Sequence, residues 1–128
     1  MNPLGALALT ALAVTACERA QIAPTTPRAA MAELARCALD GVGDAPRPDV
    51  LEAALRRALR DGRARFALRA GRCEEALSAA RDPCLDPLRA RWSALLTEAQ
   101  RPEGDVILSD VAVRRVGEAW ASALSRCR

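Results

Sequence analysis

The chain has 128 residues, a formal net charge of +3 and a hydrophobic content of 51%, much of it alanine. It contains no histidine, tyrosine or lysine, so all nineteen cations are arginine, a bias typical of a GC-rich genome. Because the usual general bases are missing, we expect neither an enzyme nor a cofactor. Few residues are aromatic or β-branched, so the composition suits closely packed helices better than a sheet.

Residues 1–16 predict a cleaved signal peptide. None of them carries a charged side chain, and Leu4 to Ala16 is almost entirely apolar. Thirteen helical residues span about 20 Å, which is too short for the roughly 30 Å hydrocarbon core of a membrane. This length suits the hydrophobic region of a secretory signal peptide, which plays no part in the mature fold.

The segment Val14-Thr15-Ala16-Cys17 resembles the lipobox of bacterial lipoproteins. The resemblance implies that Cys17 receives a diacylglyceryl group, that residues 1–16 are removed, and that the new amine is acylated, for example with palmitate. Two or three acyl chains anchor a protein stably to a membrane. The chain departs from the pattern because no Lys or Arg precedes the apolar run. The alternative is an ordinary signal peptide that leaves Cys17 as an unmodified thiol. Glu18, in place of the Asp that retains lipoproteins in the inner membrane, favours the outer membrane of a Gram-negative envelope.

Residues 17–26 are expected to form a tether and residues 27–128 a single helical domain. The 112 residues that follow the signal peptide are enough for one small domain. We predict an all-α fold, either a small disulfide-stapled bundle or stacked helical hairpins, with five or six helices.

The apolar spacing and the turn residues place these helices in chain order. Thr26 and Pro27 are typical of a helix start, Gly71 is expected to interrupt a helix, and Asp86 and Ser109 are expected to cap two others. The predicted helices cover residues 27–40, 48–61, 63–70, 72–81, 86–100 and 109–127.

One short stretch, Gly71-Arg72-Cys73-Glu74-Glu75-Ala76-Leu77, resembles the turn and second helix of a tetratricopeptide helix pair. The resemblance covers about 25 residues and implies only local packing of two helices. The chain departs from the family at Arg63, Ala64 and Ala67, where Leu, Gly and Tyr are usual, and no second copy is present.

Apart from Cys17, the chain has an even set of cysteines: Cys37, Cys73, Cys84 and Cys127. Their spacings are 36, 11 and 43 residues, with no Cys-x-x-Cys pair and no histidine. This pattern argues against a zinc or other metal site and against a thioredoxin-like redox site. In an oxidising envelope it predicts two structural disulfides.

The favoured pairing is Cys84 with Cys127 and therefore Cys37 with Cys73. A helix between Cys73 and Cys84 would hold them about 15 Å apart, whereas a disulfide needs Cα atoms within about 7 Å. The last two helices, joined by a short turn, are expected to lie antiparallel. If Cys84 is level with Cys127, Trp92 meets Trp120, and we expect the two rings to stack.

Residues 47–72 hold eight arginines against three acids. This segment suits either a solvated helix face or an acidic partner such as anionic lipid. We expect a membrane-anchored envelope lipoprotein that acts as a helical interaction or structural module, with an envelope protein as partner and no nucleic acid. The alternative is a small-ligand or lipid-binding lipoprotein, which would need an apolar cavity of about 300 Å³ or more in the bundle.

Overall fold

The computed structural model describes residues 25–101 and 106–128, and within these ranges all regular structure is helical. The predicted all-α fold is therefore confirmed. The elements in chain order are α2 (Pro27–Ala38), α3 (Pro48–Asp61), α4 (Arg63–Cys73), α5 (Glu75–Ser78), the 3-10 turn η1 (Pro83–Leu85), α6 (Asp86–Ala99) and α7 (Val106–Arg126).

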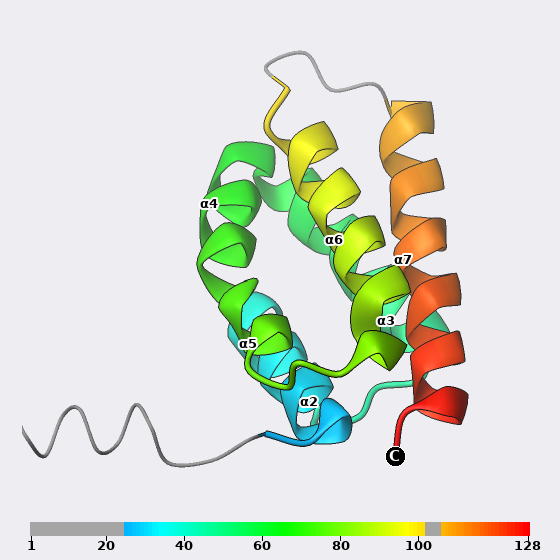
Figure 1. Cartoon of the computed structure of the whole chain (residues 1–128). Coiled ribbons are helices and arrows are strands. Elements are labelled where there is room, and N and C mark those ends of the chain that lie inside the picture. Colours follow the sequence, from blue (N-terminus) through cyan, green and yellow to red (C-terminus); the bar gives the residue numbers. More distant parts are fainter. Residues whose placement is uncertain (1–24, 102–105) are drawn as a thin grey trace, which may run out of the picture.

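Helices α6 and α7 run side by side and antiparallel, with α3 behind them and α2, α4 and α5 beside them (Figure 1). Helix α7 packs against both α6 and α3, while α4 links α2 to α6. We call the end where α6 finishes and α7 begins the hairpin end. The opposite end, where α2 begins and α7 finishes, is the terminal end (Figure 1).

Local side chains explain two of the helix starts. The Thr26 hydroxyl accepts a hydrogen bond from the backbone N–H of Ala29 at 3.1 Å, and proline follows it in the first turn, as predicted. The prediction that Asp86 caps α6 is wrong. The Asp82 carboxylate instead accepts the Cys84 N–H at 2.9 Å and starts η1, which leads directly into α6 with Asp86 as its first helical residue.

The predicted break at Gly71 is also wrong, because α4 continues through it to Cys73. Phe66, Ala70 and Cys73 are buried at helical spacing, and their packing outweighs the cost of about 1 kcal/mol for glycine inside a helix. The chain bends after Cys73, which leaves α5 only four residues long. The predicted helix over 72–81 is thus divided, with residues 72 and 73 in α4 and residues 75–78 in α5.

The core is built mainly from leucine and alanine, with both tryptophans fully buried in it. The predicted stack of Trp92 on Trp120 is wrong. Trp92 instead makes an edge contact with Phe66, with ring centroids 6.4 Å apart. The Trp120 indole N–H donates to the Pro46 carbonyl at 2.8 Å, because a buried indole needs an acceptor and the loop before α3 supplies one.

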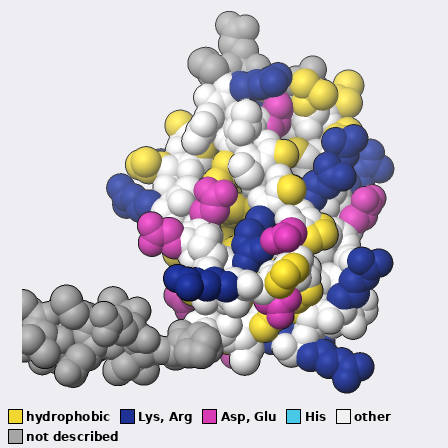
Figure 2. Space-filling model, viewed as in Figure 1, with side chains coloured by type: hydrophobic (Ala, Val, Ile, Leu, Met, Phe, Trp, Pro, Cys, Tyr) yellow, Lys and Arg dark blue, Asp and Glu magenta, His cyan; other side chains and the backbone are white. Residues whose placement is uncertain are grey.

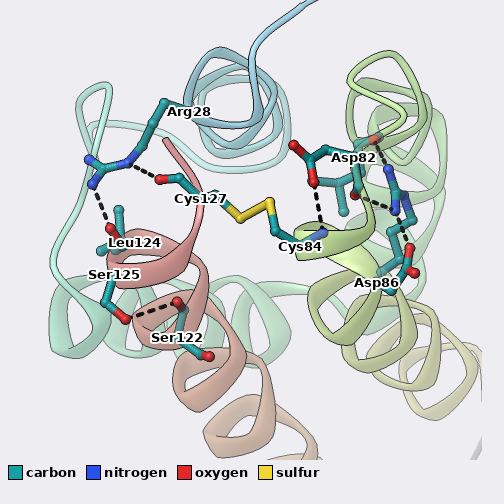
Figure 3. Close-up of a disulfide and its surroundings, with 10 residues drawn as sticks. Arg28, Asp82, Cys84, Asp86, Ser122, Leu124, Ser125 and Cys127 are labelled. Carbon is teal, nitrogen blue, oxygen red and sulfur yellow. Dashed lines mark hydrogen bonds and ion pairs between the residues drawn. A yellow bond between two sulfur atoms is a disulfide. The ribbon is translucent and has the colours of Figure 1, made fainter.

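Two disulfides join elements that are distant in sequence, Cys37 to Cys73 and Cys84 to Cys127. These are the pairs that the sequence favours, and each has a Cα–Cα distance of 5.7 Å. Beside the second bond, the Arg28 guanidinium donates to the carbonyls of Leu124 and Cys127 (Figure 3). Arg28 therefore caps the last turn of α7 and holds the start of α2 against it at the terminal end.

Candidate functional site

The hairpin end exposes three consecutive apolar side chains, which we call the apolar tip. Helix α7 begins at Val106, three residues before the predicted Ser109. Val106, Ile107 and Leu108 are 81%, 73% and 46% exposed. Figure 2 shows hydrophobic side chains gathered at this end of the molecule, close to basic ones. Successive helical residues point about 100° apart, so these three cannot all face the core.

A groove of about 340 Å³ lies next to the apolar tip, between the second half of α3 and the first half of α7. Leu59 and Val113 are almost fully buried in its floor, and Val106 stands at its edge. Three arginines and one aspartate add charge to this apolar base. We call it the apolar-basic groove, and it is lined by Arg56, Leu59, Arg60, Arg63, Val106, Ser109, Asp110 and Val113.

The arginines of the groove differ in how they are held. Arg56 Nε donates to Asp110 Oδ1 at 2.8 Å and Nη2 donates to Glu52 Oε1 at 3.2 Å. The hydrogen bond that Arg56 donates to Asp110 raises the pKa of the Arg56 guanidinium above its usual range. Arg60, one turn along α3, is exposed and has no ion pair within the part of the chain that the structure describes. Arg60 is therefore the cation that is available to a bound group.

Arg63 closes the end of the groove by joining three helices. From the start of α4 it donates at 2.7 Å to the Ser109 hydroxyl on α7 and at 2.7 Å to the Glu98 carbonyl at the end of α6. Its Nη2 atom also lies 3.8 Å from the Glu98 carboxylate, whose side chain is only 10% exposed. Arg63 therefore fixes the hairpin end against α4 and sets the position of the apolar tip.

Replacing Arg63 with methionine, which keeps most of the side-chain volume, should destabilise the domain by about 2–3 kcal/mol. The change removes one of the two cations beside the buried Glu98 carboxylate, the other being Arg101 at 3.5 Å, and it removes the donor from two acceptors. Thermal unfolding monitored by circular dichroism should show a clearly lower midpoint.

The matched control is Arg65→Met on the same helix, because Arg65 is exposed and forms no ion pair with any described residue. It should change stability by no more than about 0.5 kcal/mol. Adding Glu98→Gln to Arg63→Met should restore part of the loss. Equal effects of the two arginine substitutions would show that Arg63 does not hold the hairpin end.

Four arginines of the basic segment 47–72 are engaged in ion pairs and four are not. The paired ones are Arg47, Arg56, Arg63 and Arg69. Arg69, for example, bridges to Asp40 at 2.9 Å, and its hydrogen bond lowers the pKa of that carboxyl group. Within the described residues the others have no ionic partner: Arg57, Arg60, Arg65 and Arg72. The segment is thus partly self-neutralised, and its free charges lie on α3 and α4.

The predicted site residues lie in different parts of the molecule. Cys17 is outside the described residues, and the other four cysteines form the two disulfides, away from the groove.

No protein family model, curated protein or solved structure matches this chain. Across residues 25–101 and 106–128, no cluster of three or more potential metal ligands occurs. In the same ranges, none of the helices combines the length and the apolar character needed to cross a bilayer.

Two other hollows are less suited to an acidic ligand, since the arginine in each already donates to carbonyls of the chain itself. One, of about 250 Å³, lies beside Trp120 and Arg28, whose N–H groups donate to carbonyls of the chain itself. The other, of about 320 Å³, is lined by Arg89, which donates to the Leu77 carbonyl at 2.9 Å. The apolar-basic groove joins an exposed apolar surface to an unpaired cation.

Neither the apolar tip nor the groove was predicted from the sequence. A turn over residues 101–105 and a cap at Ser109 left Val106 to Leu108 outside the predicted helix. The signal was present, because three successive large apolar residues beside a polar turn cannot all be buried by a helix. The groove, in contrast, depends on how α3 crosses α7, which no local pattern encodes.

Proposed function

We propose that this protein is a non-catalytic interaction module of the bacterial cell envelope, tethered to a membrane by lipid on Cys17, which binds another envelope protein with its hairpin end. The observation that carries the proposal is the apolar tip, where Val106, Ile107 and Leu108 stand exposed at the start of α7. Contiguous exposed apolar side chains are typical of protein interaction sites. The lipobox-like segment that ends at Cys17 supports the membrane tether.

The second candidate function is binding of a small ligand or lipid. The apolar-basic groove favours it, because its volume of about 340 Å³ exceeds the minimum that we set for a ligand cavity. The groove is nevertheless open at the surface and not enclosed within the bundle. A small ligand seated there would leave much of the apolar tip uncovered, whereas a protein surface could cover both features. We therefore place the protein partner first.

Photo-crosslinking in cells tests the first candidate. A photoreactive amino acid at position 107 of the full-length chain, where the native side chain is 73% exposed, should give one discrete covalent adduct after irradiation. The same amino acid at position 90, an exposed alanine on α6 away from the groove, should give little or none. Immunoblotting of the tagged protein checks both results.

Equal labelling from positions 107 and 90, or no adduct from either, would contradict the proposed interaction surface. Loss of the adduct when a small apolar ligand is present during irradiation would favour the second candidate. The membrane tether is tested separately by the Cys17→Ser substitution and by the intact mass of the wild-type protein.

A further inference from the structure

We infer that the apolar-basic groove selects a protein segment that combines apolar and acidic side chains; this inference rests on the proposed interaction at the hairpin end. The floor of the groove is apolar, because Leu59 of α3 and Val113 of α7 form it, and Val106 extends it to the apolar tip. An apolar side chain of the partner can therefore move out of water and into the groove without burying a polar group of the groove.

The charge of the groove points to an acidic partner. Its lining carries three guanidinium groups and one carboxylate, that of Asp110. Arg56 and Arg63 are held by carboxylates of the chain itself, while Arg60 is exposed without such a partner in the described residues. A carboxylate at Arg60 would gain a charge-assisted hydrogen bond, and a basic side chain there would be repelled. Arg60 therefore sets the sign of the partner's charge.

The position of the groove favours a protein over the membrane that holds the tether. Arg28 places the start of α2 at the end of α7, so the tether enters at the terminal end. The groove lies at the other end of α7, whose 21 residues span about 31 Å. The ten residues from Cys17 to Thr26 reach at most about 35 Å when fully extended. If α7 stands upright on the membrane, its hairpin end faces away from the bilayer, and turning that end toward the same bilayer would require nearly complete extension of the tether, at a large entropic cost.

The test uses the full-length chain with the photoreactive amino acid at position 107, combined with Arg60→Glu. Charge reversal should lower the yield of the adduct by about tenfold or more, since it turns attraction for a carboxylate into repulsion. Arg60→Gln should cause an intermediate loss. Arg57→Glu is the matched control, because Arg57 is an exposed, unpaired arginine on the same helix but outside the groove, and it should leave the yield unchanged. Circular dichroism melts of the three variants check that each is folded.

Mass spectrometry of the crosslinked peptide completes the test. A peptide of another protein, with an acidic residue within one helical turn of apolar residues, is the expected result. A phospholipid adduct, a peptide of a second copy of this chain, or a partner peptide without acidic residues would overturn the inference. An adduct that forms equally well with Arg60→Glu would also overturn it while leaving the proposed interaction intact. The complete absence of an adduct at position 107 would instead contradict the proposed function.

Discussion

Reduction of both disulfides should unfold the domain or lower its melting temperature by tens of degrees. The bonds close loops with sequence separations of 36 and 43 residues. Each bond lowers the conformational entropy of the unfolded chain, which raises the free energy of unfolding by about 4 kcal/mol. The net stability of a small domain is about 5–15 kcal/mol, so both bonds together account for much of it. Circular dichroism melts with and without a phosphine reductant measure the effect.

Paired substitutions separate the two bonds. Cys37→Ala with Cys73→Ala, and Cys84→Ala with Cys127→Ala, should each lower the melting temperature by roughly 15–30 °C. Alanine avoids placing a hydroxyl at Cys73 or Cys127, which are both buried. An unchanged melt after complete reduction, verified by alkylation of four thiols, would refute a stabilising role. Proteolysis without reduction should release a linked peptide that contains Cys84 and Cys127.

The second large effect is expected from Cys17→Ser, which should move the protein from the membrane fraction to the soluble fraction or leave it unprocessed. A serine hydroxyl cannot accept the thioether-linked diacylglyceryl group that the lipobox resemblance implies. Intact mass of the wild-type membrane form should show a chain that begins at Cys17 and carries acyl groups. The matched control is Cys37→Ala with Cys73→Ala, which also removes sulfur but should keep the protein on the membrane.

A soluble wild-type protein with an unmodified Cys17 would contradict the lipid tether. It would leave the apolar tip unaffected as an interaction site, because that site depends only on the folded domain. Carbonate extraction distinguishes covalent lipid from peripheral adsorption, since adsorbed protein is released at high pH and lipid-anchored protein is retained.

Much of the fold could be predicted because the helix-start residues and the pairing of helices by their apolar stripes indicate the same arrangement. Thr26 and Pro27 mark the first helix, and the apolar stripes of α6 and α7 fix a register that brings Cys84 to Cys127. The predictions failed where packing overrides a local pattern. Gly71 is compatible with either a break or a continuous helix, and burial of Phe66 and Cys73 decides between them. The tryptophan stack failed because α7 also packs on α3, which gives Trp120 a different partner.

The candidate site was less accessible to prediction. Composition indicated a surplus of arginine over residues 47–72, but it could not tell which side chains are neutralised within the fold. Arg56 and Asp110 are 54 positions apart in the chain, and Arg63 and Ser109 are 46 positions apart. Such pairs follow from the crossing of α3, α4 and α7. Only after these contacts are known does Arg60 stand out as the available cation in the groove.

The two cross-links also determine how the domain would transmit a mechanical load. If a partner holds the start of α7 while the membrane holds Cys17, tension enters at α2 and passes from Cys37 directly to Cys73. Helix α3 lies inside the closed loop and is never stretched. From Cys84 the load divides between α6 and, through Cys127, α7. Even if the domain unfolded under tension, the two disulfides would shorten the path between its points of attachment. It could then extend to only a fraction of the length of the fully stretched chain, which suits a link between two moving parts of an envelope.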